Sequence, residues 1–254
     1  MLFMIKSLGW TLATTRAVLI VFLVAFHGAM IALLPETSPK LRAYVIQSFG
    51  RTITWALGVR VTTFGAPSAD RTIIIANHRS YSDIPILAGL CPVVFLAKAE
   101  LAGWPVIGWA ARKARTVFVD RHDPESRERS RTTLRDRLSE GLSVLVFSEG
   151  TTSARGTLLP LKPGMFHEAA LAQLPIQVVY LEYSEDDDSW INDDTISHHF
   201  YARFSRWNTH IKVVYREELM HVSIDEARPG QRMCEEATAW LHAQIKRNLG
   251  DVRS

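Results

Sequence analysis

The sequence predicts an α/β fold: a mainly parallel sheet of about seven strands with helices packed on it, preceded by N-terminal membrane-anchoring helices. Short β-rich runs alternate with helical segments after residue 58, which is typical of a parallel sheet. An uncharged apolar run precedes this pattern, at residues 17–34. Polar residues follow several of the expected strands, and open α/β sheets carry their sites at that edge.

Composition limits the classes of protein to consider. Hydrophobic residues make up 47% of the 254 residues and charged residues 22%, which excludes a disordered chain. The net charge of +3 is too small to indicate a nucleic-acid partner, and no zinc-finger or RNP-like spacing is present. Cys91 and Cys234 stand far apart, so they do not form a disulfide framework. No metal site or organic cofactor is predicted.

The run from Ala17 to Leu34 has three interpretations. Its 18 residues contain no formal charge, and as a helix they would span about 27 Å. A signal peptide would need a shorter run and a small-residue cleavage site, which the following stretch does not offer. A buried core helix would be unusually continuous in its apolar character. The pattern therefore favours a transmembrane or membrane-dipping anchor.

The next segment, Lys40–Leu57, has apolar residues near helical spacing, with Arg42 and Arg51 among them. Such a helix either lies in the lipid headgroup region or packs on the folded domain, and the pattern leaves both open. Basic residues are slightly richer after the apolar run than before it. This asymmetry predicts a membrane-associated protein whose bulk lies on the cytoplasmic face.

The chain is accordingly divided into an anchor at residues 1–57 and a domain at residues 58–254, with its core motifs at 72–183. The expected strands are Val59–Phe64, Thr72–Ala76, Val93–Leu96, Thr116–Val119, Val144–Phe147, Ile176–Tyr183 and Ile211–Tyr215. The expected helices are Asp83–Leu90, Pro105–Lys113, Pro124–Glu140, Phe166–Gln173 and Asp225–Leu249. The acidic stretch Glu185–Asp194 is expected to be a solvated loop.

The segment Asn77–Asp83 (NHRSYSD) carries the clearest chemical signal. His78 follows a predicted strand directly, and Asp83 opens the next helix. The turn between them would return the carboxylate to the imidazole, which orients a general base and stabilises its protonated form. A histidine that caps a helix or lies in the core is the alternative. Signatures of nucleotide-binding loops, serine-hydrolase elbows and zinc peptidases do not occur.

Other polar groups follow neighbouring strands in the same way. Arg121 comes just after one strand, Glu149 with Gly150 and Thr151 after another, and Lys162 leads into a helix. Arginine offers a bidentate contact to a phosphate and lysine a point charge. The set suits an anionic substrate with a hydroxyl group to be deprotonated.

These blocks, in this order, resemble the glycerolipid acyltransferase family, the lysophosphatidic acid acyltransferases of the PlsC type. Asn77–Asp83 is similar to the NHxxxxD block of that family, and Phe118–Arg121 to its second block. Phe147–Thr151 is similar to the third block, and Pro175–Val179 loosely to the fourth. The connecting stretch Phe95–Leu101 is also similar.

The resemblance implies an O-acyltransferase that moves a fatty acyl chain from acyl-CoA or acyl-carrier protein to a lysolipid hydroxyl at the lipid bilayer. His78 would be the general base and Asp83 its partner. The acceptor head group would be placed by Arg121 with Glu149, Gly150 and Thr151, and Lys98 and Lys162 would help.

The sequence departs from the family at points that concern the acceptor. Thr152 replaces an arginine of the third block, Ser148 replaces a proline there, and Gln177 replaces a proline of the fourth. Arg155 or Arg115 could stand in for the lost arginine. We expect 1-acylglycerol-3-phosphate as acceptor, with lyso-ornithine lipid as the alternative. The alternatives from other functional classes are a lipid hydrolase and a catalytically silent lipid-binding protein.

Overall fold

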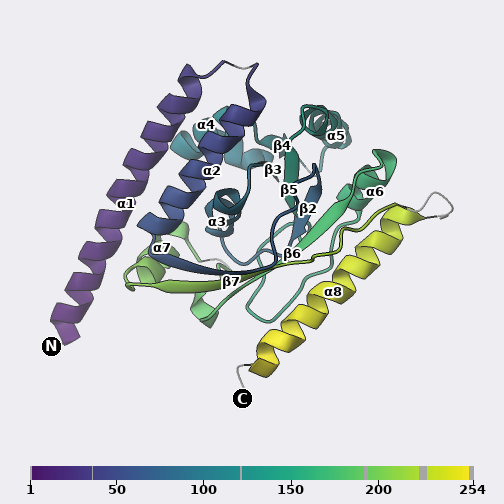
Figure 1. The fold of residues 1–254 in the computed structure, drawn as a ribbon. Coiled ribbons are helices and arrows are strands. Elements are labelled where there is room, and N and C mark those ends of the chain that lie inside the picture. Colours follow the sequence, from purple (N-terminus) through teal and green to yellow (C-terminus); the bar gives the residue numbers. More distant parts are fainter. Residues whose placement is uncertain (1, 36, 121, 192–193, 223–227, 252–254) are drawn as a thin grey trace.

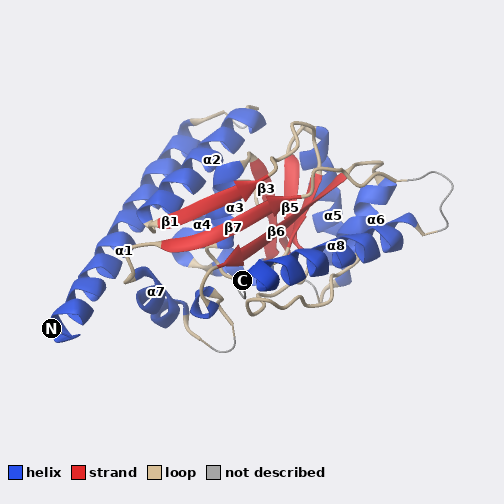
Figure 2. Ribbon diagram, turned by 60° about the horizontal axis from the view of Figure 1, so that its bottom comes forward, coloured by secondary structure: helices blue, strands red, loops and turns tan. Residues whose placement is uncertain are grey.

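A seven-stranded sheet lies between two layers of helices in the computed structural model (Figures 1 and 2). The structure describes residues 2–35, 37–120, 122–191, 194–222 and 228–251. Helices α1 and α2 lie side by side at one end of the molecule, and α8 runs along the other face of the sheet (Figure 1).

The sheet confirms the predicted fold class. Its strands follow the order β1-β7-β6-β2-β5-β3-β4, and all neighbours are parallel except β6 and β7. The strands are β1 (Val59–Phe64), β2 (Ile73–Ala76), β3 (Val93–Lys98), β4 (Val117–Val119), β5 (Ser143–Phe147), β6 (Ile176–Tyr183) and β7 (Thr209–Tyr215). Because β6, β2 and β5 are adjacent and parallel, their carboxyl ends meet at one place on the sheet edge.

Eight α-helices are assigned in the part of the chain that the structure describes. They are α1 (Leu2–Leu33), α2 (Pro39–Ala56), α3 (Asp83–Leu90), α4 (Pro105–Lys113), α5 (Pro124–Ser139), α6 (Gly164–Leu171), α7 (Ile196–Phe204) and α8 (Pro229–Asp251). The first three of the expected domain helices match α3, α4 and α5 closely. The start of the expected Asp225–Leu249 helix lies partly outside the described residues, and α7 had not been expected at all.

Alternation along the strands produces two separate hydrophobic cores. On β2, Ile73 and Ile75 point into the core under α5, α6 and α8, whereas Ile74 and Ala76 point into the core under α2 and α3. A strand that is apolar on both faces is what a covered parallel sheet requires. The site described below lies at the end of the second face.

Helix α1 is apolar around most of its circumference and lies against α2, α4 and α7. Its segment Ser7–Leu33 is long and apolar enough to cross a membrane. Phe22 and Phe26 remain 64% and 50% exposed, whereas Arg16 is buried. The Arg16 guanidinium donates to the backbone carbonyls of residues 204, 206 and 207, at the end of α7. One side of the helix therefore packs on the rest of the protein, and the other side exposes apolar side chains.

Helix α2 packs on α3, which is the arrangement on the folded domain that the sequence left open. Ile46 and Ile53 of α2 are buried in the core. The two helices cross where Gly50 meets Gly89: a Cβ atom on Gly50 would lie 2.4 Å from the Gly89 nitrogen and 2.5 Å from the Pro85 carbonyl oxygen. Only glycine permits this approach, because those neighbours are backbone atoms and cannot rotate away.

We expect Gly50→Ala to lower the free energy of unfolding by about 1–3 kcal/mol, the usual cost of overpacking a core. Thermal unfolding followed by circular dichroism measures this, at about 2–4 °C per kcal/mol for a chain of this size. Gly250→Ala is the matched control, because it also replaces a helical glycine but has open space around its Cβ position. Equal melting temperatures for the two variants would contradict this account of the α2–α3 crossing.

Candidate active site

His78 and Asp83 form a hydrogen-bonded pair at the carboxyl end of β2. The loop after β2 carries the histidine, and Asp83 is the first residue of α3, so the four residues between them return the carboxylate to the ring. His78 Nδ1 lies 2.8 Å from Asp83 Oδ2. The Asp83 side chain is fully buried, while that of His78 is 16% exposed. The turn that the sequence predicted between the two residues is therefore present.

Four donors surround the buried Asp83 carboxylate. Oδ2 accepts from the backbone N–H groups of Arg79 at 2.6 Å and Ser80 at 2.8 Å, in addition to the imidazole. Oδ1 accepts from the hydroxyl of Tyr183 at 2.5 Å. A buried carboxylate is costly unless its oxygens are satisfied, and here both are.

The arrangement fixes which imidazole nitrogen is available for chemistry. An ionised carboxylate only accepts, so Nδ1 of His78 carries the proton that it shares with Asp83, and Nε2 is left as the basic nitrogen. The ring also stacks on Phe147, with centroids 3.9 Å apart and planes inclined by 15°. Both contacts hold the orientation of the ring.

The third sequence block holds the backbone of His78. Glu149 accepts from the His78 N–H at 2.7 Å through one oxygen and from the Leu159 N–H at 2.8 Å through the other. The Ser153 N–H donates to the His78 carbonyl at 2.8 Å. Gly150 makes the intervening turn with φ of +82°, a conformation that favours glycine. Glu149 is thus bonded to the backbone of the His78 loop, and its predicted contact with substrate stays a prediction.

A second buried ion pair lies beneath the loop. Arg79 contacts the carboxylate of Glu182 through Nε at 2.8 Å and Nη2 at 3.0 Å, and both side chains are buried. Burial would lower the pKa of Arg79, but the hydrogen bond and charge of Glu182 outweigh it and raise the pKa above its ordinary value. Asn77 adds a two-way hydrogen bond to the backbone of Leu181, at 2.8 Å in each direction. The loop is therefore fastened to β6 on both sides of His78.

Comparisons with known proteins agree with this arrangement. Residues 59–182 match the family model described as Acyltransferase. The matched residues contain β1, the His78 loop and most of β6. Residues 59–182 form an acyltransferase-family domain.

The relatives of the chain fall into two groups. A lyso-ornithine lipid O-acyltransferase of Pseudomonas aeruginosa is 33% identical over 166 residues, or 63% of this chain and 64% of that protein. A 1-acyl-sn-glycerol-3-phosphate acyltransferase of Cocos nucifera is 33% identical over 159 residues, or 60% of this chain and 52% of that protein. The matched part thus spans less than two thirds of either relative.

The fold is shared with a solved structure. The crystal structure of the 1-acyl-sn-glycerophosphate acyltransferase PlsC from Thermotoga maritima superposes with a TM-score of 0.66. The superposition covers 96% of this chain and 95% of that chain at 23% identity. At this identity the likeness establishes the fold alone, and it includes the N-terminal helices.

The other predicted substrate residues come from several separate segments of the chain. Arg121 lies outside the described residues. Thr151 is exposed next to Gly150, and Lys162 is exposed just before α6, with its backbone N–H on the Ser148 carbonyl. Lys98 is exposed at the carboxyl end of β3. Their contacts with a substrate stay predictions.

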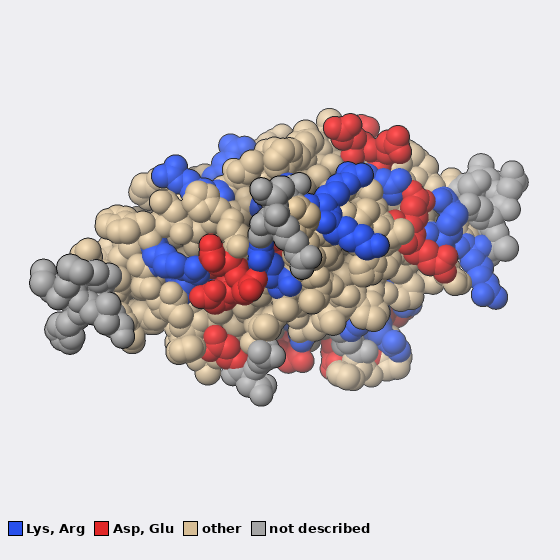
Figure 3. All heavy atoms as spheres, turned by 90° about the horizontal axis from the view of Figure 1, so that it is seen from below, with Lys and Arg blue, Asp and Glu red and all other residues tan. Residues whose placement is uncertain are grey.

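Thr152 holds a loop in place instead of presenting a charge. Its hydroxyl donates to the backbone carbonyl of Trp190, whose own N–H donates to the Arg79 carbonyl at 2.8 Å. The acidic stretch containing Trp190 is therefore attached to the loop that carries His78. The prediction that this stretch is solvated was wrong at Asp188, which is buried and paired with Arg203 and Arg206. On one face of the molecule, acidic and basic side chains lie next to one another in this way (Figure 3).

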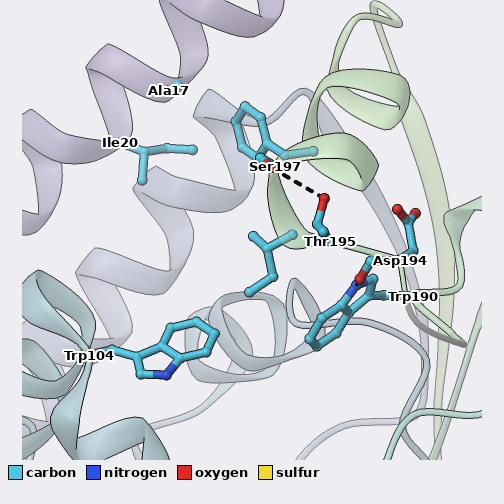
Figure 4. A pocket seen from close by; sticks show the side chains of 9 residues that line it. Ala17, Ile20, Trp104, Trp190, Asp194, Thr195 and Ser197 are labelled. Atoms are coloured by element: carbon cyan, nitrogen blue, oxygen red, sulfur yellow. Dashed lines mark hydrogen bonds between the residues drawn. The ribbon is translucent and has the colours of Figure 1, made fainter.

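An open cavity of about 660 Å³ lies next to this loop, between α1, α7 and the start of α4 (Figure 4). Trp190 forms one wall and packs edge-on against Tyr81 of the catalytic loop, with centroids 5.6 Å apart. The walls are mostly apolar, and nine residues line them: Ala17, Ile20, Trp104, Trp190, Asp194, Thr195, Ile196, Ser197 and Phe200. No group of three potential metal ligands occurs among the described residues.

Sequence reasoning missed the residues of this site that come from β6 and α7. Tyr183 was identified only as the end of a strand, and Arg203 was assigned no element. A signal for α7 did exist: Thr195 caps the helix by accepting from the His198 N–H, and Ile196, His199, Phe200 and Arg203 follow at helical spacing.

We expect Arg79→Met to destabilise the acyltransferase domain by about 3–5 kcal/mol, because it leaves the buried Glu182 carboxylate without its cation. Chemical denaturation measures the loss. The double variant Arg79→Met with Glu182→Gln should regain part of it, since the second change removes the uncompensated charge. A single variant as stable as the parent protein would refute the structural role assigned to this pair.

Proposed function

We propose that this protein transfers a fatty acyl chain from a thioester to the free hydroxyl of a lysolipid, with His78 as general base. The observation that carries the proposal is the pair of His78 and Asp83, in which a partly exposed ring bonds through Nδ1 to a fully buried carboxylate. This arrangement presents Nε2 to a substrate and supports the charge that the ring acquires.

The proposed reaction uses this geometry as follows. Nε2 takes the proton of the acceptor hydroxyl as its oxygen bonds to the thioester carbonyl carbon. The resulting tetrahedral intermediate breaks its C–S bond, and the departing thiolate of CoA or acyl-carrier protein takes the proton back from the imidazolium. Asp83 stays ionised throughout and stabilises the imidazolium. The acyl group passes directly to the acceptor, so no acyl-enzyme forms and no cofactor is consumed.

The cavity beside Trp190 is a suitable groove for an acyl chain. It lies next to the catalytic loop through the contact of Trp190 with Tyr81, and α1 forms part of its wall. Since α1 also exposes Phe22 and Phe26, a lipid tail in this groove would pass directly into hydrocarbon. We therefore infer that α1 rests in the bilayer surface, with the domain on the cytoplasmic face.

Lyso-ornithine lipid is the acceptor that the surroundings of the loop favour. The two arginines that could replace the missing arginine of the third block both have other partners: Arg155 binds Asp186 and the Tyr183 carbonyl, and Arg115 binds Glu140. Thr152 itself is bonded to the acidic stretch. A zwitterionic head group, with an ammonium as well as a carboxylate, suits these surroundings better than a phosphate. Relatives named for this acceptor match at 33–37% identity.

We expect His78→Ala to reduce acyl transfer by about 10²–10⁴-fold, the usual contribution of a general base. Asp83→Asn should also reduce kcat, because an amide cannot stabilise the imidazolium. Transfer of a labelled acyl chain to lysolipid in vesicles measures both. Binding of the variants to vesicles should be unchanged, since α1 is intact; transfer at the parent rate by His78→Ala would exclude the proposed base.

The acceptor is tested by offering lyso-ornithine lipid and lysophosphatidic acid side by side, with acyl-CoA and acyl-carrier protein in separate arms. We expect about tenfold or greater preference for the ornithine lipid in kcat/KM. Thr152→Arg should move the preference towards the phosphate, because a charged hydrogen bond contributes about 1.5–3 kcal/mol. Thr152→Ser, which keeps the hydroxyl, is the control. A phosphate preference in the parent protein would reverse the assignment.

The role of α1 is tested by changing its exposed face. Phe22→Ser with Phe26→Ser should weaken binding to lipid vesicles by about tenfold or more, because each side chain loses about 1.5–3 kcal/mol of burial in lipid. Co-sedimentation with vesicles measures the change. Arg129→Gln, on the exposed surface of α5, is the control. Undiminished binding of the double serine variant would show that another surface meets the membrane.

A further inference from the structure

We propose that Tyr183 and Arg203 are positioning residues for the His78–Asp83 pair, so that α7 sets the strength of the catalytic base. Both lie beyond residues 59–182, the part that matches the family model. The inference rests on the proposed function, because it assigns to these two residues an effect on the rate of acyl transfer through His78.

Tyr183 is the last residue of β6, and it reaches the carboxylate from the side opposite the imidazole. Its hydroxyl donates to Asp83 Oδ1 at 2.5 Å and lies 3.0 Å from the hydroxyl of Ser82. Tyr183 is buried, and burial together with the negative charge of Asp83 raises its pKa well above the ordinary value. The hydroxyl therefore keeps its proton at every pH at which the enzyme works, and it is a permanent donor.

Arg203 holds both the tyrosine and the loop. Its guanidinium carbon lies 4.1 Å from the centroid of the Tyr183 ring, and its Nη1 donates to the hydroxyls of Ser80 and Ser82 at 3.1 Å each. Nη1 also donates to the Asp188 carbonyl at 2.8 Å. The side chain is 1% exposed. Asp188 balances the charge of this buried cation, and the hydrogen bonds of Nη1 to Ser80 and Ser82 direct it to the residues that frame Asp83.

The charges around the His78–Asp83 pair determine the expected effect of removing the Tyr183 hydroxyl or the Arg203 guanidinium. The His78–Asp83 pair is surrounded by charged and neutral titratable groups. The charged ones are Glu149, the pair Arg79–Glu182, and Asp188 with Arg203 and Arg206; the neutral ones are Tyr183, Tyr81 and His199. Tyr183 and Arg203 both stabilise negative charge on Asp83, by a hydrogen bond and by a positive charge. Without either of them Asp83 holds the imidazole proton more strongly. The imidazolium then persists to higher pH, and less of the free base is present at a given pH.

The direct test is Tyr183→Phe, which removes one hydroxyl and keeps the ring beneath Arg203. We expect kcat to fall about tenfold with KM for both substrates nearly unchanged. The acid limb of the pH–rate profile should move to higher pH by about 0.5–1 unit. Tyr215→Phe is the matched control: that tyrosine is also buried, on the neighbouring strand, and its hydroxyl has no hydrogen-bond partner among the described residues. It should leave kcat and the acid limb unchanged.

Arg203→Met tests the charge, and Arg203→Lys should restore part of the rate by restoring the charge without the planar contacts. If Arg203→Met does not fold, Arg203→Lys and Tyr183→Phe carry the test. A folded Tyr183→Phe protein with the parent kcat and the parent pH profile would overturn the proposal. So would a fall in kcat without movement of the acid limb, which a purely structural role would give.

A second measurement separates this inference from the proposed function. Titration of the His78 imidazole by NMR in detergent, assigned with His78→Ala, reports its protonation without any acyl transfer. We expect the midpoint to rise in Tyr183→Phe and not in Tyr215→Phe. If the parent protein acylates neither acceptor, the proposed function fails while this titration still decides the positioning role. An unmoved midpoint in an active enzyme would refute the positioning role alone.

Discussion

The burial of the Asp83 carboxylate is the constraint on which the site depends. A fully buried carboxylate is stable only if its lone pairs are used, and this one uses donors from three places: the His78 ring, the loop backbone and β6. Each donor must be held at its own distance. The two hydrogen bonds of Asn77 with Leu181 and the Arg79–Glu182 ion pair keep the loop against β6 and so hold these donors in place.

Sheet order explains why these parts meet. Glu149 follows His78 by 71 positions in the sequence, and Tyr183 follows Glu149 by 34. They end or follow β2, β5 and β6, which are adjacent and parallel. Parallel neighbours place their carboxyl ends on one edge, so three distant segments supply His78, the carboxylate that binds its backbone and the hydroxyl that contacts Asp83.

The sequence predicted the fold class, all seven strands and the pairing of His78 with Asp83, because each leaves a local pattern. Alternation, apolar runs and the short spacing of the NHRSYSD segment are properties of neighbouring residues. The contacts of Tyr183 and Arg203 leave none, since they join residues 100 and more apart and depend on how α7 docks. Asp188 shows the same limit: an acidic run reads as solvated until Arg203 and Arg206 are known to lie beside it.

Helix α7 links α1 to the loop between His78 and Asp83. At its carboxyl end, Arg16 of α1 donates to the carbonyls of residues 204, 206 and 207, which is where a helix best accepts a cation. One residue before that end, Arg203 donates to the hydroxyls of Ser80 and Ser82. The exposed apolar face of α1 and the buried carboxylate of Asp83 are thus connected through one short helix with an arginine contact at each junction. The docking of α1 and the position of Arg203 are therefore coupled, because the residues whose carbonyls bind Arg16 also end the helix that carries Arg203.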